Sequence, residues 1–122
     1  MITALIAALA MATLAVTAAP ALAHAVLVKS IPDSRALLGR PPDRVQLLFN
    51  ERLEAAFSTV SVWSASGRQV DRQDAVVGPD DAKGLSVSLP PIEPGTYTVR
   101  FRVLSVDGHI VGSSFRFTVK RR

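Results

Sequence analysis

The sequence contains no cysteine, and its only two methionines, Met1 and Met11, lie close to the start of the chain. No disulfide can form, so the folded state must be held together by a packed core. The soft sulfur ligands that Cu(I) prefers are confined to those two thioethers. Histidine is equally scarce, since His24 and His109 are the only two, and any site built on imidazole must use them.

Charge is absent from residues 1–23, which begin with an apolar run over residues 2–16. The segment ends in Ala21-Leu22-Ala23, the small-x-small pattern that signal peptidase cleaves. No Lys or Arg lies near its start, and no basic cluster follows that would stop its transfer through a membrane. We expect residues 1–23 to be a signal peptide and residues 24–122 to be one exported domain that begins with His24.

Removing 23 of 122 residues leaves 99, which is enough chain for one domain with a modest core. All 14 basic and 10 acidic side chains belong to this domain, which therefore carries the whole formal charge of +4. The basic side chains are scattered, and only Lys120-Arg121-Arg122 forms a run, so the charge indicates solubility rather than a nucleic-acid surface. We expect a monomer without a nucleic-acid partner.

Short segments that alternate apolar and polar side chains follow one another through the domain, separated by Gly, Pro, Asn and Asp. These predicted strands cover residues 25–29, 44–50, 59–63, 68–72, 85–89, 96–106 and 114–120, with a surface loop at 74–84. The last two are the clearest, and residues 107–112 would connect them as a hairpin. About seven strands predict an all-β fold, an antiparallel β-sandwich of immunoglobulin-like or Greek-key type. A helical turn fits only at residues 35–38 or 51–57.

Four further side chains invite a functional interpretation. Trp63 and Tyr97 lie in alternating segments, so we expect both to pack in the core. Glu54 and Glu93 could serve as acid and base, but nothing in the sequence brings them together, and we interpret both as solvated loop charges. None of the four receives a catalytic role.

Cleavage before His24 would give this residue two metal-binding nitrogens, its free α-amine and its imidazole. The second histidine follows a carboxylate in Asp107-Gly108-His109, on the predicted strand connection, and a sandwich can bring the start of its first strand to that connection. Three nitrogens and one carboxylate favour Cu(II), with zinc as the second choice, whereas calcium and magnesium prefer oxygen. An isolated Asp-Gly-His is usually just a turn, but both histidines occupy special positions, which favours a metal site.

The same residues resemble the CopC family of periplasmic copper-binding proteins. His24-Ala25-Val26-Leu27 with Ser30-Ile31-Pro32 is similar to the family's opening, and residues 45–51 resemble its next strand. The block from residue 94 to residue 119, which contains Ser105-Val106-Asp107-Gly108-His109, matches its most diagnostic part. The resemblance covers essentially all of residues 24–122.

This resemblance implies a β-sandwich that binds one Cu(II) ion through His24, Asp107 and His109. Glu51 stands where the family has an acidic residue, and it either orients a ligand imidazole or is a solvated charge. Family members with an additional Cu(I) site use a methionine-rich segment that this chain lacks, so the resemblance is to the Cu(II)-only type. It implies a periplasmic carrier or buffer for copper homeostasis or resistance, not an enzyme, with a CopD-type inner-membrane importer as its partner.

Two alternatives belong to other classes of protein. A terminal histidine on a sandwich also resembles the copper brace of lytic polysaccharide monooxygenases, although Asp107 would occupy the position that oxygen needs and the domain offers little room for a polysaccharide platform. A metal-free sandwich could instead act in adhesion or assembly through its basic strand faces. That alternative predicts that copper does not change the melting temperature.

Overall fold

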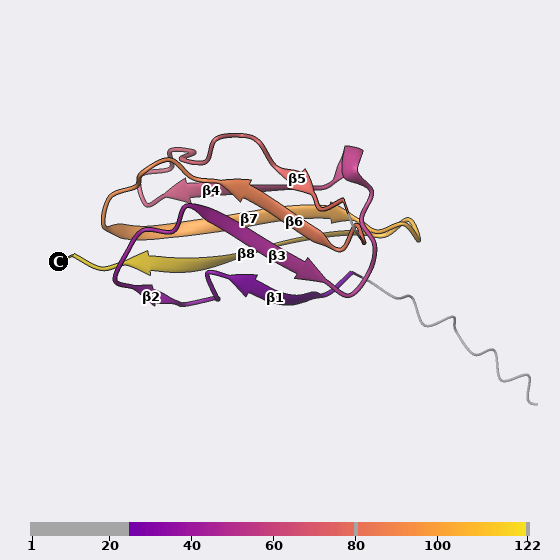
Figure 1. The fold of residues 1–122 in the computed structure, drawn as a ribbon, viewed down its shortest axis with the longest axis horizontal. Coiled ribbons are helices and arrows are strands. Elements are labelled where there is room, and N and C mark those ends of the chain that lie inside the picture. Colours follow the sequence, from indigo (N-terminus) through magenta and orange to yellow (C-terminus); the bar gives the residue numbers. More distant parts are fainter. Residues whose placement is uncertain (1–24, 80, 122) are drawn as a thin grey trace, which may run out of the picture.

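The computed structural model describes residues 25–79 and 81–121, so the predicted signal peptide and His24 lie outside the described residues. Two layers of strands make up the fold (Figure 1). In chain order the elements are β1 Leu27–Ile31, β2 Leu37–Leu38, β3 Arg44–Phe49, the 3-10 helix η1 Ala55–Phe57, β4 Thr59–Ser64, β5 Val76–Val77, β6 Gly84–Ser88, β7 Gly95–Leu104 and β8 Ile110–Val119. No helix within the described ranges is long and apolar enough to cross a membrane.

The strands form two four-stranded sheets, with the orders β1-β3-β6-β5 and β2-β8-β7-β4. This arrangement confirms the predicted all-β sandwich. One pairing differs from the antiparallel prediction, because β2 runs parallel to β8. Backbone hydrogen bonds hold that pair, from Arg35 N to Arg116 O (2.7 Å) and from Thr118 N to Ala36 O (2.8 Å). The helical turn considered for residues 35–38 is therefore wrong, whereas η1 lies within the other predicted range.

Three predicted boundaries also need correction. Ser30 and Ile31 belong to β1 rather than to a turn, because they pair with β3. The last hairpin is longer than predicted, since Ile110 is already paired with Leu104 and only residues 105–109 connect the strands. The predicted surface loop at 74–84 contains β5, which pairs with β6.

Residues 68–72 do not form the predicted strand, and β4 gains only one isolated bridge there, between Trp63 and Gln69. The buried Asp71 explains the interruption. Its Oδ2 accepts the hydrogen bond of Val62 N (2.8 Å), which a strand carbonyl would otherwise accept. The Asp71 side chain thus takes one position of the backbone ladder, although Val70 N still donates to Val62 O (2.9 Å) and Ser64 N to Arg68 O (2.8 Å).

The core lies between the two sheets and follows from the period-2 alternation of the strands. In β7 the odd-numbered residues from Tyr97 to Val103 are buried and the even-numbered ones face outward. Phe49 and Phe101 meet edge to face across the layers, with ring centroids 5.4 Å apart. The other fully buried side chains are mostly branched aliphatics: Val45, Val60, Val62, Leu85, Val87, Val99 and Val103.

Trp63 is not a core residue, contrary to the prediction. It shares its strand parity with Thr59 and Ser61, which face outward, and it lies half-buried on the outer face of β4. Its Nε1 donates to Ser61 Oγ (2.8 Å), and the Arg100 guanidinium lies 5.0 Å from its ring centroid. A cation-π contact with a neighbouring strand therefore takes the place of core packing.

Tyr97 is buried as predicted, and its ring stacks on Phe117 with centroids 5.5 Å apart. Its hydroxyl donates to the backbone carbonyl of Glu93 (2.5 Å), four residues upstream, as in the tyrosine corner of immunoglobulin-like sandwiches. Burial, followed by the nearby Glu93 charge, raises the pKa of this hydroxyl above its ordinary value, so it remains a donor at neutral pH.

Tyr97→Phe should lower the free energy of unfolding by about 1 kcal/mol, because the ring is kept and one hydrogen bond is lost. For a domain of this size the melting temperature should fall by about 4–8 °C. Urea titrations of the two proteins measure the difference directly. An unchanged midpoint would show that water replaces this hydrogen bond without loss.

Candidate metal centre

The connection between β7 and β8 is a tight hairpin whose shape depends on its backbone. Ser105 N donates to His109 O (3.0 Å) and Gly108 N donates to Ser105 O (2.9 Å), which closes the turn. Gly108 has a φ of +93°, a left-handed conformation that side chains other than glycine rarely adopt. The glycine thus allows the residues on either side of it to approach each other.

The Asp107 and His109 side chains face one another across this turn. His109 Nδ1 lies 3.2 Å from Asp107 Oδ1, and the same oxygen accepts a hydrogen bond from His109 N (3.3 Å). Ser105, which is fully buried, donates its hydroxyl hydrogen to Asp107 Oδ1. The two side chains predicted to bind a metal therefore lie on one side of a turn, and a serine holds the carboxylate in place.

Electrostatics keeps the Asp107 carboxylate ready to bind a cation. The hydrogen bond from the Ser105 hydroxyl, followed by those from His109, lowers the pKa of Asp107 below its ordinary value, although partial desolvation opposes them. The group is consequently ionised at neutral pH. An ionised carboxylate next to an imidazole can share a proton or a metal ion with it.

The start of the described chain lies at the same end of the sandwich. Val26 N donates to Asn50 Oδ1 (2.6 Å), and Asn50 N donates to Val26 O (3.1 Å). Two residues further on, Arg52 O accepts from Val106 N (2.9 Å). The segment after β3 therefore contacts both the first residues of the domain and the residue before Asp107.

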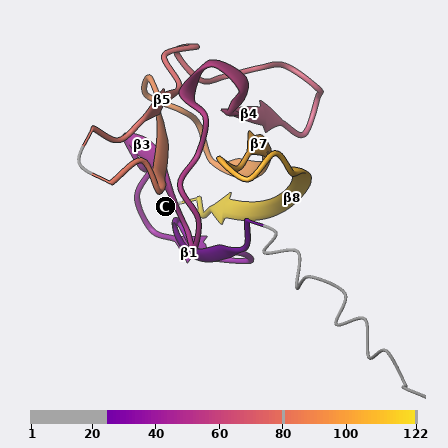
Figure 2. The ribbon, with the colours of Figure 1, turned by 90° about the vertical axis from the view of Figure 1, so that its right-hand side faces the viewer.

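Figure 1 shows this arrangement, with the start of β1, the end of β3 and the β7–β8 connection at one end of the molecule, the end that faces the viewer in Figure 2. Ala25, the first described residue, is buried in the core, which fixes the point where the chain enters the sandwich. The residue that precedes it in the sequence is His24. The expected convergence of the chain start with the Asp107–His109 turn is thus consistent with the fold.

Within the described residues, no cluster of three or more His, Cys, Asp or Glu side chains surrounds a common point. Asp107 and His109 are brought together, whereas His24 lies outside the described residues. Glu51 is partly exposed at this same end, directly after Asn50. Asp107 and His109 are thus two of the three predicted ligands, and a metal site built on them would need at least one more group.

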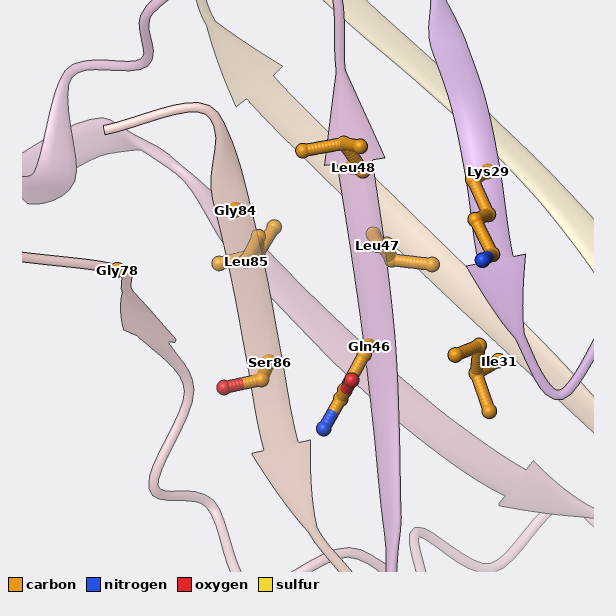
Figure 3. Close-up of a pocket in the computed structure, with 9 residues that line it drawn as sticks. All are labelled: Lys29, Ile31, Gln46, Leu47, Leu48, Gly78, Gly84, Leu85 and Ser86. Atoms are coloured by element: carbon orange, nitrogen blue, oxygen red, sulfur yellow. The ribbon is translucent and has the colours of Figure 1, made fainter. Parts of the chain in front are cut away.

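A separate hollow of about 360 Å³ lies on the outer face of the first sheet, across β1, β3 and β6 (Figure 3). Its polar side chains are Lys29, Gln46 and Ser86, and the rest of its lining is apolar side chains and glycines. It contains no carboxylate, imidazole or thiol. This hollow therefore offers a metal ion no suitable ligand.

Sequence reasoning missed two residues that support the candidate metal centre, Asn50 and Ser105. The strand pattern predicts Asn50 only as the last residue of a strand, although an Asn at such a position often bonds a backbone group. The signal for Ser105 is its spacing of two residues before Asp107, which permits a local hydrogen bond between side chains. The Asn50 contact depends on the tertiary structure, whereas the Ser105 contact is local.

Comparisons with known proteins identify relatives of the whole domain. Residues 27–120 match the CopC domain family. Protein YobA of Escherichia coli strain K12 is 33% identical over 114 residues, which cover 93% of this chain and 92% of YobA. Copper resistance protein C of Escherichia coli is 30% identical over 107 residues, which cover 82% of this chain and 84% of that protein. The crystal structure of CopC from Methylosinus trichosporium OB3b superposes with a TM-score of 0.74 at 35% identity, covering 80% of this chain and 94% of that one.

Proposed function

Because the chain belongs to the CopC family, we propose that it is an exported copper-binding protein that carries or sequesters Cu(II) for copper homeostasis or resistance. Relatives named for copper resistance support this proposal, and the family consists of copper-binding carriers rather than enzymes. The observation that carries it is the Asp107–His109 turn, whose donor atoms lie 3.2 Å apart beside the entry point of the chain.

We propose that one Cu(II) ion is bound by the α-amine and imidazole of His24 together with Asp107 and His109. This set of three nitrogens and one carboxylate oxygen suits the tetragonal preference of Cu(II), and divalent affinities peak at copper. Two metal–ligand bonds of about 2.0–2.1 Å at a right angle separate their donor atoms by about 3 Å. The spacing of the Asp107 and His109 donors agrees with that requirement.

The remaining ligand depends on processing. Cleavage after residue 23 would leave His24 directly before the buried Ala25, and the paired hydrogen bonds between Val26 and Asn50 would hold the new terminus near the turn. Glu51 would then lie close enough to orient an imidazole of the site. Since the sequence after residue 11 contains no methionine, no thioether is present for a Cu(I) site in the mature domain.

The periplasm is the proposed location, and a CopD-type inner-membrane copper transporter is the proposed recipient. A carrier of this kind would bind Cu(II) tightly outside the cytoplasmic membrane and release it to that transporter. The polysaccharide-oxidising and adhesive alternatives lose support, because the family assignment rests on relatives named for copper resistance.

The test is intact-mass spectrometry of the exported protein with and without one equivalent of Cu(II), followed by electron paramagnetic resonance of the same sample. We expect a mass that begins at His24, one bound copper ion and a tetragonal, nitrogen-rich spectrum. A different terminus or weak, heterogeneous copper binding would contradict the proposed site. Zinc added in competition should fail to displace the copper, in keeping with the order of divalent affinities.

A further inference from the structure

The outer face of the second sheet has an unusual distribution of charge. Three exposed arginines lie on it, Arg100 and Arg102 on β7 and Arg116 on β8. The neighbouring outward positions are uncharged: Thr59, Ser61, Trp63, Thr98, Ser114 and Thr118. None of the three arginines forms an ion pair with a carboxylate of residues 25–79 or 81–121. This arginine face therefore has positive charge that the described fold does not neutralise.

The pairing of the strands keeps the three arginines close together. Arg100 and Arg102 are two residues apart on one strand, which places their Cα atoms about 7 Å apart. Arg116 pairs with Thr98, one outward position from Arg100, on the adjacent strand. Arg100 is also held over the Trp63 ring, at 5.0 Å from its centroid, so part of its conformational freedom is already lost. Such an array suits several negative groups on one surface.

Apolar side chains protrude at one end of the same face. A hollow of about 420 Å³ is lined by Arg102 together with Ala56, Phe57, Ser58, Thr59, Leu104 and Ile110. Phe57 is 68% exposed and Ile110 is 59% exposed, and because both line this hollow they form one apolar patch beside the charged row. Arg102 belongs to both the hollow and the arginine face, so the two features are continuous.

We propose that this face binds an anionic phospholipid surface. Phe57 and Ile110 would enter the boundary between head groups and acyl chains, while Arg100, Arg102 and Arg116 would contact lipid phosphates, which guanidinium groups bind well. The positive charge of this face favours an anionic partner. Phe57 and Ile110 favour a lipid surface over an acidic protein, because an acidic protein surface would offer these apolar side chains no apolar layer to enter. Because Ile110 directly follows His109, docking would also bring the candidate metal centre to the membrane.

The experiment is sedimentation of the copper-free mature protein with vesicles of phosphatidylcholine alone or mixed with phosphatidylglycerol. The wild type should bind the mixed vesicles and leave the neutral ones unbound. Each arginine near an anionic surface strengthens binding by about fivefold, so R100Q/R102Q/R116Q should weaken it by about 100-fold at low salt. The matched control R40Q/R44Q/R72Q removes three exposed arginines from other elements and should retain most of the binding.

A second variant, F57S/I110S, tests the apolar part, and it should weaken binding to the mixed vesicles and make the remaining binding more sensitive to salt, because only charge then holds the protein. Both side chains are exposed, so the variant should fold and still take up copper. If the arginine variant and its control lost equal amounts of binding to the mixed vesicles, the proposal would be overturned. The proposal would also be overturned if the protein bound polyglutamate as tightly as the mixed vesicles and F57S/I110S left that binding unchanged. That result would indicate an acidic protein partner. Since copper plays no part in these measurements, their failure would leave the proposed copper site untouched.

Discussion

Replacing His109 with alanine is expected to weaken Cu(II) binding by more than about 100-fold, because even residues behind a metal ligand typically contribute 10- to 100-fold. The fold should survive. The His109 backbone carbonyl, which accepts the hydrogen bond from Ser105 N, is retained in alanine. The imidazole–carboxylate pair itself is about one-third exposed on both sides, so solvent screens it and its loss should change the free energy of unfolding little.

Mass action converts this loss into a thermal shift. Free copper at about 1,000 times the wild-type Kd should stabilise the wild type by about 4 kcal/mol, whereas a 100-fold weaker variant gains only about 1.4 kcal/mol. For a domain of this size the copper-induced rise in melting temperature should therefore shrink by about 10–20 °C. Differential scanning calorimetry of both proteins with and without copper measures this rise in melting temperature.

Val106→Ala is the matched control, since Val106 is exposed in the same hairpin and carries no metal-binding group. This variant should keep the full copper-induced shift and the full resonance signal. Retention of both by the His109→Ala protein would mean that the turn is not the copper site.

Adding a Gly-Ser-Gly-Ser leader in front of His24, long enough to keep this histidine out of the third position where a new terminal chelate would form, is expected to reduce copper affinity by a similar factor, more than about 100-fold. The leader turns the α-amine of His24 into an amide, whose nitrogen must lose its proton before it can bind copper. The chelate formed by the amine and imidazole of one residue is then lost. Isothermal titration of the extended and mature proteins with Cu(II) measures the difference.

The same leader placed after Arg122 is the control, because it adds equal length without changing the α-amine. That protein should bind copper as the mature form does. If the N-terminal leader left the affinity unchanged, the free amine of His24 would be no ligand, and the site would have to be completed by another group, with Glu51 the nearest candidate by position.

Strand alternation in the sequence predicts much of the fold. The buried and exposed positions of β7 are the ones expected from its sequence, because a strand turns successive side chains to opposite faces whatever it pairs with. By the same rule, the odd-numbered residues of β4 share one face, so Trp63 faces outward with Thr59 and Ser61. The core prediction for Trp63 is wrong because it relies on the alternating segment as a whole and overlooks that Trp63 is out of step with the buried Val60 and Val62.

The sequence alone does not predict which strands pair with each other. β2 is only two residues long, and its parallel alignment with β8 depends on hydrogen bonds to residues about 80 positions away. The interruption at residues 68–72 has a similar origin, because Asp71 competes with the backbone for Val62 N. Non-local contacts of this kind leave no periodic signal in a single sequence.

By itself, the sequence determined which groups could bind a metal, since two histidines and no cysteine leave few choices, and it determined the sandwich through its alternating segments. Only the tertiary structure decided that Asn50 fastens the first residues of the domain and that Ser105, which donates to Asp107, is buried. It also decided that three arginines share one face. The identity of a residue determines which chemical groups it offers, whereas strand order and register determine which distant residues meet.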